Sequence, residues 1–227
     1  MEKRFVYADN AATTRVSDEV VAAMLPYFTE YYGNPSAVYG FAGKAKTAIE
    51  NARAQVATAL GATPGEIYFV SCGTEADNWA VYGTVRKLGK RGKHIVTTAM
   101  EHHAILNCMK DLEAQGYEVT YLQPDSLGNI TVEQLKQALR KDTILVSVMM
   151  VNNEVGSLQP IAQMARLTHR LAPEAIFHTD AVQGFLKVPF QAKTLGADLI
   201  SLSSHKIHGP KGAGALYISP RLKSFPA

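Results

Sequence analysis

Apolar residues along this chain fall into two patterns that alternate from residue 66 to residue 219. Short runs rich in β-branched and aromatic residues have the composition of buried strands. Longer segments between them repeat apolar residues every three or four positions, as on one face of a helix. This alternation predicts βαβ units and therefore an α/β fold with a parallel sheet. The strand-like runs are residues 66–71, 94–99, 118–123, 143–151, 175–180, 198–203 and 214–219.

Three of these segments carry further information about packing. The run 143–151 (TILVSVMMV) is apolar almost throughout, which predicts a central strand covered on both faces. Thr131 and Gln134 form a capping-box pattern that fixes a helix start. A helix over 44–60 carries a narrow stripe of small residues, and we expect this stripe to lie close against the sheet. The stripe consists of Ala45, Ala48, Ile49, Ala52, Val56, Ala59 and Leu60.

Polar residues follow five of the predicted strands. The carboxyl ends of parallel strands meet at one edge of a sheet, and ligands bind there. After the first strand, Gly73 makes a tight turn into a helix that begins near Thr74. Free N–H groups at a helix start form an anion site suited to phosphate, although Thr74 as a simple helix cap explains the segment equally well.

The next two strand ends are ambiguous when each is taken alone. His102 and His103 follow the second strand, where they suit a metal site, a stacking platform or a capped helix start. Asn152, Asn153 and Glu154 directly follow the most apolar strand. Their polar groups need partners, which points to a polar site or a structured turn.

The last two strand ends supply a carboxylate and an amine. Asp180, followed by Gln183, ends a central strand, where a carboxylate is costly unless a protonated ring nitrogen or a metal meets it. Lys206 lies in SSHKIHGPKGAG, and a lysine at a strand end suits a Schiff base. Lys211, flanked by glycines, is interpreted as a turn residue.

Together these groups match the parts of pyridoxal phosphate (PLP). They offer a phosphate cradle, amides for a phenolic oxygen, an imidazole, a carboxylate for the ring nitrogen and an amine. Asp180 keeps the pyridine nitrogen protonated in this interpretation, and Lys206 anchors the cofactor and moves protons. A metal hydrolase is the alternative, but it leaves Lys206 and the phosphate cradle unused. Its ligands would come from His102, His103, His178, Asp180, His205 and His208.

The composition indicates the class of protein and its cellular compartment. A chain of 227 residues, 47% apolar and 19% charged, suits one globular domain. Two cysteines form neither a disulfide framework nor a zinc site, and no apolar run is long enough for a signal peptide or a membrane span. We therefore expect a cytoplasmic protein without membrane contact. The net charge is +3, and the basic segment 86–93 falls at a predicted helix end, which favours a solvated helix end over a nucleic-acid site.

Six motifs, in order, resemble those of cysteine desulfurases of the NifS/IscS group over essentially the whole chain. They are YADNAATT, SCGTEADN, EHHAIL, VNNEVG, HTDAVQ and SSHKIHGPKGAG. The resemblance implies PLP fold type I of the class V aminotransferase-like enzymes, a three-layer αβα arrangement around a mostly parallel sheet, and a homodimer. It implies an N-terminal segment over 1–15 near the active site and the small domain, and a PLP-binding large domain over 16–227. The C-terminal small domain is expected to be absent.

The resemblance also implies a role for each site residue. Lys206 corresponds to the Schiff-base lysine, Asp180 to the partner of the pyridine nitrogen, and His102, rather than His103, to the imidazole that stacks on the ring. The other implied cofactor contacts are Gly73, Thr74, Ser203 and His205 at the phosphate, and Asn153 and Gln183 near the phenolic oxygen; no metal is expected.

In the family's reaction, L-cysteine becomes L-alanine and its sulfur passes through an enzyme persulfide to iron–sulfur scaffold proteins or other acceptors. The family's persulfide cysteine, substrate-binding arginine and partner-reaching threonine lie downstream of the lysine, and no cysteine follows Lys206 here. Cys72, fixed in the phosphate turn, and Cys108, expected to be buried, do not replace the nucleophile. We therefore expect an incomplete chain that does not turn over alone. The alternatives are a selenocysteine lyase, another class V aminotransferase, or an inert PLP-binding or oligomerisation module.

Overall fold

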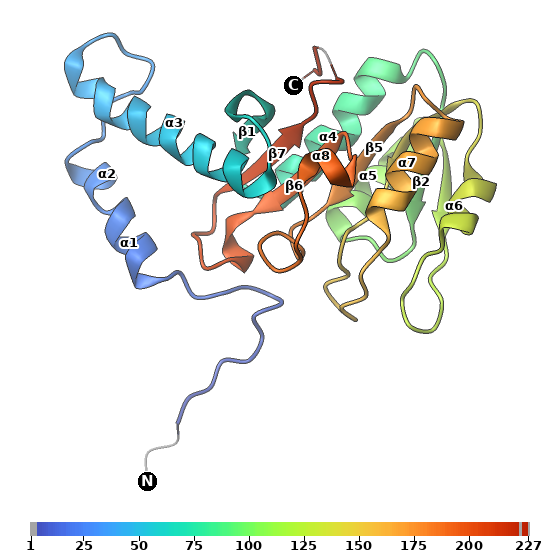
Figure 1. Ribbon diagram of the computed structural model, residues 1–227, viewed down its shortest axis with the longest axis horizontal. Helices are drawn as coiled ribbons and strands as arrows, with labels where there is room; N and C mark the ends of the chain where they lie inside the picture. Colours follow the sequence, from blue (N-terminus) through green and yellow to red (C-terminus); the bar gives the residue numbers. More distant parts are fainter. Residues whose placement is uncertain (1–3, 223, 227) are drawn as a thin grey trace.

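The computed structural model describes residues 4–222 and 224–226, and seven strands in these residues form one sheet (Figure 1). The strand order is β1-β7-β6-β5-β4-β2-β3. All neighbours from β6 to β3 run parallel, whereas β7 is antiparallel to both β6 and β1. The mostly parallel sheet is therefore confirmed. The strands are β1 (Ile67–Val70), β2 (His94–Thr98), β3 (Glu118–Leu122), β4 (Thr143–Ser147), β5 (Ile176–Asp180), β6 (Leu199–Ser203) and β7 (Gly214–Ile218).

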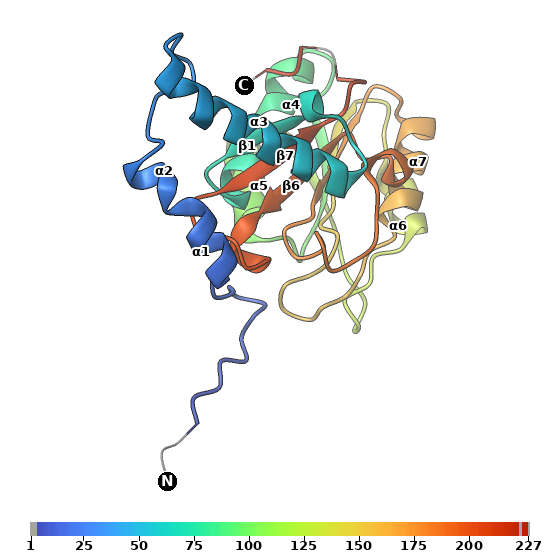
Figure 2. The ribbon, with the colours of Figure 1, turned by 60° about the vertical axis from the view of Figure 1, so that its left-hand side comes forward.

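Helices cover both faces of this sheet, which confirms the three-layer αβα arrangement (Figure 2). One apolar cluster joins α4 and α5 to one face, and a second joins α6, α7, α8 and the C-terminal end of α3 to the other. The helices are α1 (Asp18–Met24), α2 (Pro26–Thr29), α3 (Gly40–Leu60), α4 (Gly73–Leu88), α5 (His103–Ala114), α6 (Val132–Ala138), α7 (Ile161–Leu171) and α8 (Ala192–Leu195), with short 3-10 turns at Pro64–Glu66 and Ser204–Lys206.

The central strand is shorter than its apolar run predicts. β4 is buried throughout and lies between β2 and β5, so its central position is confirmed. The prediction that it reaches residue 151 is wrong, because β4 ends at Ser147. Its last pair with β2 is Val146 with Val96, and the residues that follow run beside β5, as when the Met150 N–H donates to the Asp180 carbonyl (2.8 Å). These residues stay buried without being part of a two-sided ladder, which explains why they remain apolar.

The small-residue stripe of α3 packs only in part. Ala45 and Leu60 are buried, but Ile49 is 40% exposed and Ala59 is exposed. The first half of α3 projects beyond the sheet together with α1 and α2, as Figures 1 and 2 show. The stripe therefore packs against the sheet only near the C-terminal end of the helix, next to β1.

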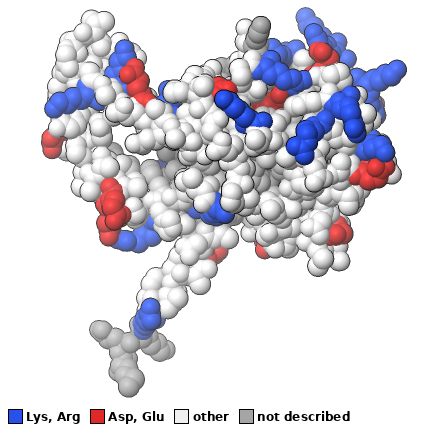
Figure 3. Space-filling model, in the orientation of Figure 1, with Lys and Arg blue, Asp and Glu red and all other residues white. Residues whose placement is uncertain are grey.

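Several local predictions are confirmed. Thr131 and Gln134 form the capping box that opens α6, and Lys211 lies exposed in a turn. Basic side chains occupy the last turns of α4 and α7, and Figure 3 shows Lys and Arg gathered over this end of the molecule. Cations complement the negative ends of helices there. In the part of the chain that the structure describes, every helix is too short or too polar to cross a bilayer.

The division into a segment over 1–15 and a large domain over 16–227 stays a prediction. Residues 1–3, 223 and 227 fall within these ranges but lie outside the described residues. The described part forms the three layers given above.

Leu186 occupies an unfavourable backbone conformation, with φ of 59° and a side chain that is 64% exposed. A residue with a Cβ costs roughly 1–2 kcal/mol in this left-handed region. Leu186→Gly is expected to raise the free energy of unfolding by about 0.5–1 kcal/mol, because the greater freedom of glycine in the unfolded chain offsets part of the relief. Thermal unfolding measures this as a rise in Tm of about 1–4 °C. Leu127→Gly, at an exposed leucine outside the left-handed region, is the control and should not stabilise; an equal gain from both changes would contradict the explanation.

Candidate active site

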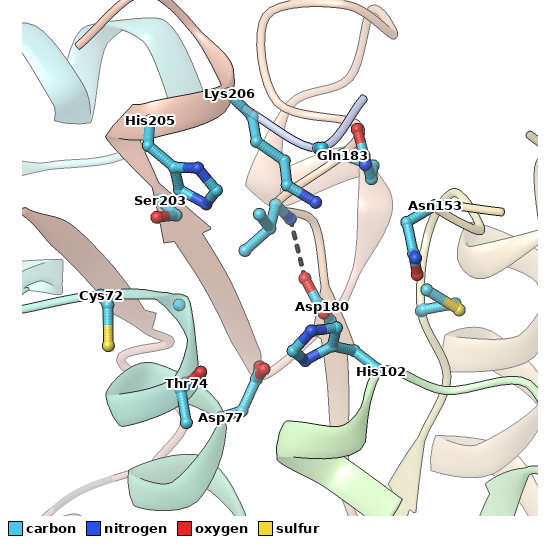
Figure 4. Close-up of a pocket in the computed structure, with 14 residues that line it drawn as sticks. Cys72, Thr74, Asp77, His102, Asn153, Asp180, Gln183, Ser203, His205 and Lys206 are labelled. Carbon is cyan, nitrogen blue, oxygen red and sulfur yellow. Dashed lines mark hydrogen bonds between the residues drawn. The ribbon is translucent and has the colours of Figure 1, made fainter. Parts of the chain in front are cut away.

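A cavity of about 180 Å³ lies at the carboxyl edge of the parallel strands. All nine residues that the sequence assigned to a cofactor line it, and Figure 4 labels all of them except Gly73. Ala12, Cys72, Asp77, Met149 and Val182 complete the lining. The nine are Gly73, Thr74, His102, Asn153, Asp180, Gln183, Ser203, His205 and Lys206.

The N-terminal end of α4 forms one wall of the cavity. Its N-cap is Cys72, whose side chain accepts no capping bond, and Thr74 lies inside the first turn. The interpretation of Thr74 as a simple helix cap is therefore wrong. N–H groups of a first turn have no intrahelical partner, so they are available to an anion in the cavity. A Cβ at Gly73 would come within 2.7 Å of Val182 Cγ2, which shows how closely the β5 loop approaches this turn.

His102 combines two of the roles that its position suggested. It is the N-cap of α5, where its Nδ1 accepts a hydrogen bond from the Ala104 N–H (3.1 Å), and its ring also lines the cavity. Because Nδ1 accepts, neutral His102 carries its proton on Nε2. His103 is the exposed first residue of α5 and does not line this cavity.

The turn after β4 divides its polar residues between structure and site. Asn152 is 4% exposed, and its Oδ1 accepts hydrogen bonds from the N–H groups of Glu154 and Val155 (both 2.9 Å). Its Nδ2 donates to the Met100 carbonyl (2.9 Å). Asn152 therefore builds the turn, and Asn153 is the member of this segment that reaches the cavity.

Asp180 and Lys206 enter the cavity from neighbouring strands. Asp180 ends β5, is 6% exposed, and accepts a hydrogen bond from the Val182 N–H (2.8 Å). Burial raises the pKa of Asp180, although the Val182 N–H and the positive field of His102 and Lys206 oppose this rise. Burial lowers the pKa of Lys206, and Asp180 opposes that shift. The arrangement can hold a flat cationic ring against the carboxylate and present an amine to it.

The N-terminal segment holds the lysine loop in place. The N–H and Oγ1 of Thr14 both donate to the His205 carbonyl (2.8 and 2.9 Å), and Thr14 Oγ1 accepts from the His208 N–H (2.8 Å). His208 has a φ of 63°, a strained conformation that these contacts help to fix. Gln183 Nε2 donates to the Ala11 carbonyl (2.7 Å), so residues near position 12 form part of the cavity wall.

Sequence reasoning missed two buried carboxylates, one lining this cavity and one close to it. Asp77 lines the cavity at 1% exposure, on the face of α4 that also buries Ala76, Ala80 and Val81. An acid inside an apolar helical stripe was the available signal. Glu101 is 5% exposed, and burial raises the pKa of its carboxyl group to about 8. Its Oε1 accepts hydrogen bonds from Thr98 Oγ1 (2.7 Å) and the Met149 N–H (2.9 Å). Nothing in the local sequence distinguishes Glu101 from an exposed acid.

The metal-hydrolase alternative finds no support in the geometry. Among residues 4–222 and 224–226, no three histidine, cysteine or acidic side chains are arranged to hold a metal ion. His178 is fully buried between Ser147 and Ser201, and the His208 ring bonds the Arg15 carbonyl. These two histidines therefore do not join His102 and His205 in one ligand set.

The chain is similar to known cysteine desulfurases. It is 50% identical over 225 residues to cysteine desulfurase IscS of Methanosarcina thermophila, covering 99% of this chain and 55% of the relative. It is 51% identical over 213 residues to cysteine desulfurase 2 of Trichormus variabilis, covering 94% of this chain and 53% of the relative. The chain thus spans about half the length of the curated relatives it matches.

Solved structures agree with this similarity. A NifS-like protein is 43% identical and superposes with a TM-score of 0.92 over 97% of this chain and 60% of that one. A structure described as SspA in complex with cysteine is 38% identical with a TM-score of 0.93, over 97% of this chain and 63% of that one. The resemblance to the NifS/IscS group is confirmed, and the family model of aminotransferase class V matches residues 6–226. The chain therefore belongs to the class V aminotransferase family.

Proposed function

We propose that the protein containing this chain is a PLP-dependent cysteine desulfurase, which takes the sulfur from L-cysteine and leaves L-alanine. The observation that carries the proposal is the meeting of Lys206 and Asp180 in a cavity walled by the N-terminal end of α4. The similar proteins named as cysteine desulfurases, and the neighbour described in complex with cysteine, support the substrate.

The cavity residues fit PLP by their chemistry. The first turn of α4 offers N–H groups to a phosphate, and Gly73 leaves the close approach to Val182 free of a side chain. Asp180 offers a desolvated carboxylate to a protonated ring nitrogen, and Lys206 offers an amine to the cofactor's carbonyl carbon. Each polar part of the cofactor therefore has a counterpart in the chain.

When bound, PLP supplies an electron sink for the negative charge that develops at the substrate α-carbon. Asp180 holds the proton on the ring nitrogen, and the Val182 N–H fixes the orientation of its carboxylate. Burial lowers the pKa of Lys206, so more of this amine is neutral near pH 7 and able to take or return a proton at the α-carbon. The ring of His102, fixed by its bond to Ala104, lies against the same cavity.

The remaining contacts bind and orient the cofactor. We assign Gly73, Thr74, Ser203 and His205 to the phosphate, and Asn153 and Gln183 to the phenolic oxygen, because all six line the cavity. Burial, followed by the positive field of Lys206, lowers the pKa of His205. His205 is therefore neutral near pH 7 and contributes a hydrogen bond rather than a charge.

The sulfur acceptor is proposed to be a cysteine other than Cys72 and Cys108. Cys108 is 4% exposed, its thiol donates to Asn78 Oδ1 (2.8 Å), and burial raises its pKa to about 11. A thiol of that kind is a poor nucleophile. Cys72 is fixed as the N-cap of α4 beside the proposed phosphate. As the resemblance to the NifS/IscS group implies, we further propose a cytoplasmic homodimer that passes the sulfur to iron–sulfur scaffold proteins.

The direct test is product analysis with the whole protein that contains this chain. Incubation with PLP, L-cysteine and a thiol reductant is expected to yield sulfide and alanine in equal amounts. Parallel incubations add a keto acid or replace L-cysteine with L-selenocysteine. Amino-group transfer to the keto acid without sulfide would indicate an aminotransferase, and turnover confined to L-selenocysteine would indicate a lyase. Either outcome would contradict the proposed function.

A further inference from the structure

A second carboxylate, Asp77, lies buried beside Asp180 at the base of the cavity. Asp77 belongs to α4 and Asp180 to β5, so they reach the same place from different layers (Figure 4). They are 1% and 6% exposed, and Asp77 Oδ1 has no hydrogen-bond partner. A buried carboxylate oxygen without a donor is costly when the group is ionised.

Below Asp77, a row of polar side chains crosses the sheet. Ser147 on β4 pairs with His178 on β5, and Ser201 on β6 lies diagonally across from His178, on the face that α4 covers. His178 Nδ1 hydrogen-bonds Ser147 Oγ and His178 Nε2 hydrogen-bonds Ser201 Oγ, both at 2.9 Å. Asp77 lies directly above this row, with its Oδ1 3.5 Å from His178 Nε2.

This contact does not form an ion pair. An adjacent carboxylate would favour a charged imidazole, but complete burial lowers the pKa of His178 to about 3. His178 is therefore neutral at physiological pH and gives Asp77 no positive charge. Within the described residues, it is the only basic side chain within 4 Å of an Asp77 oxygen.

The other groups that face Asp77 are neutral or acidic. Burial raises the pKa of Asp77 well above its usual value, the charge of Asp180 adds to this, and the Ser201 hydroxyl opposes it. Ionising two carboxyl groups that lie close together and away from water is energetically costly. The titratable groups that face Asp77 are Asp180 and His178 on β5, Glu101 after β2, Cys72 at the start of α4 and Cys108 on α5.

The surroundings of the two acids decide which one keeps the proton. Asp180 accepts the Val182 N–H and lies in the positive field of Lys206 and His102. Asp77 has only the Ser201 hydroxyl to favour its charged form. These differences favour ionisation at Asp180.

We propose that Asp77 is a positioning residue that stays protonated in the folded protein, so that Asp180 carries the single negative charge at the base of the cavity. One negative charge matches one protonated ring nitrogen. A second ionised acid would compete with Asp180 for that proton and for the Lys206 ammonium. The protonation of Asp77 is a property of the chain itself, whereas its effect on the reaction rests on the proposed function.

The test compares the stability of the wild-type protein and the Asp77→Asn variant between pH 5 and pH 8, without cofactor. Asparagine has the shape of a neutral aspartic acid but takes up no proton. Unfolded Asp77 is ionised above about pH 4, so the wild-type chain must bind a proton to fold. The ratio of the wild-type to the variant folding constant is therefore expected to fall by up to tenfold per pH unit as pH rises, until the folded Asp77 titrates.

The control and a second measurement keep the result clear. Glu50→Gln, at an exposed position on α3, should change stability equally at each pH. A pH-independent difference for Asp77→Asn would overturn the proposal, because it means that Asp77 is ionised in both states. If Asp77→Asn does not fold, infrared spectra at pH 7 of the wild-type protein labelled with ¹³C-aspartate provide the test instead. A protonated-acid band that shifts with the label supports the proposal, and its absence overturns it. If the protein showed the expected pH dependence but did not convert L-cysteine, only the proposed function would be contradicted.

Discussion

Lys206→Ala is expected to remove the visible absorbance band of bound PLP and to lower turnover of L-cysteine by ~10³-fold or more. The amine lies in the cavity opposite Asp180, and burial lowers its pKa, so it serves as both covalent anchor and proton carrier. Absorbance titration with PLP and a sulfide assay measure the two effects. Borohydride reduction should fix the cofactor to the wild-type chain and not to the variant.

Lys211→Ala is the matched control for this change. Lys211 lies exposed in a turn of the same loop and outside the cavity. Its loss should leave the absorbance band and the turnover close to those of the wild-type protein. An unchanged spectrum in Lys206→Ala, or an equal loss in both variants, would refute the assignment of Lys206 as the anchor.

Asp180→Asn is expected to lower kcat by ~10²–10³-fold while PLP stays bound. Asparagine still accepts the Val182 N–H, but it cannot hold the ring nitrogen protonated with a negative charge. Lys206 and the first turn of α4 remain to retain the cofactor. Single-turnover kinetics with L-cysteine and a PLP-binding titration separate the two effects.

Asp142→Asn provides the comparison for Asp180→Asn. Asp142 forms an ion pair with Arg140 just before β4, at the opposite edge of the sheet. Its change should not alter kcat. If Asp180→Asn weakened PLP binding as much as it weakened turnover, the role of Asp180 would be structural rather than electrostatic.

The topology explains why the site could be predicted from sequence. Parallel strands place their carboxyl ends at one edge, so residues that follow different strands meet without any knowledge of tertiary contacts. Thr74, Asp180 and Lys206 are far apart along the chain, yet all three line one cavity. The antiparallel β7 does not disturb this rule, because it begins at the same edge with Gly214.

Features that depend on facing elements were not predictable in this way. Asp77 belongs to the site because α4 packs over β5. The sequence of α4 does not indicate which strand the helix will cover. The apolar residues after Ser147 stay buried although they lie beside β5 alone. Their sequence pattern is the same as that of a longer strand paired on both sides. Ile49 is exposed because α3 extends past the sheet, a matter of length and direction rather than periodicity.

The position of β7 between β6 and β1 has a consequence for how this chain is made on the ribosome. β1 lies at the sheet edge and pairs with β7, which comes last in chain order among the seven strands described here. The nascent chain therefore carries β1 as an unpaired segment while β2 to β6 are already available for pairing. The edge pairing of β1 therefore forms only after β7 has been synthesised, later than the pairings among β2 to β6 can form.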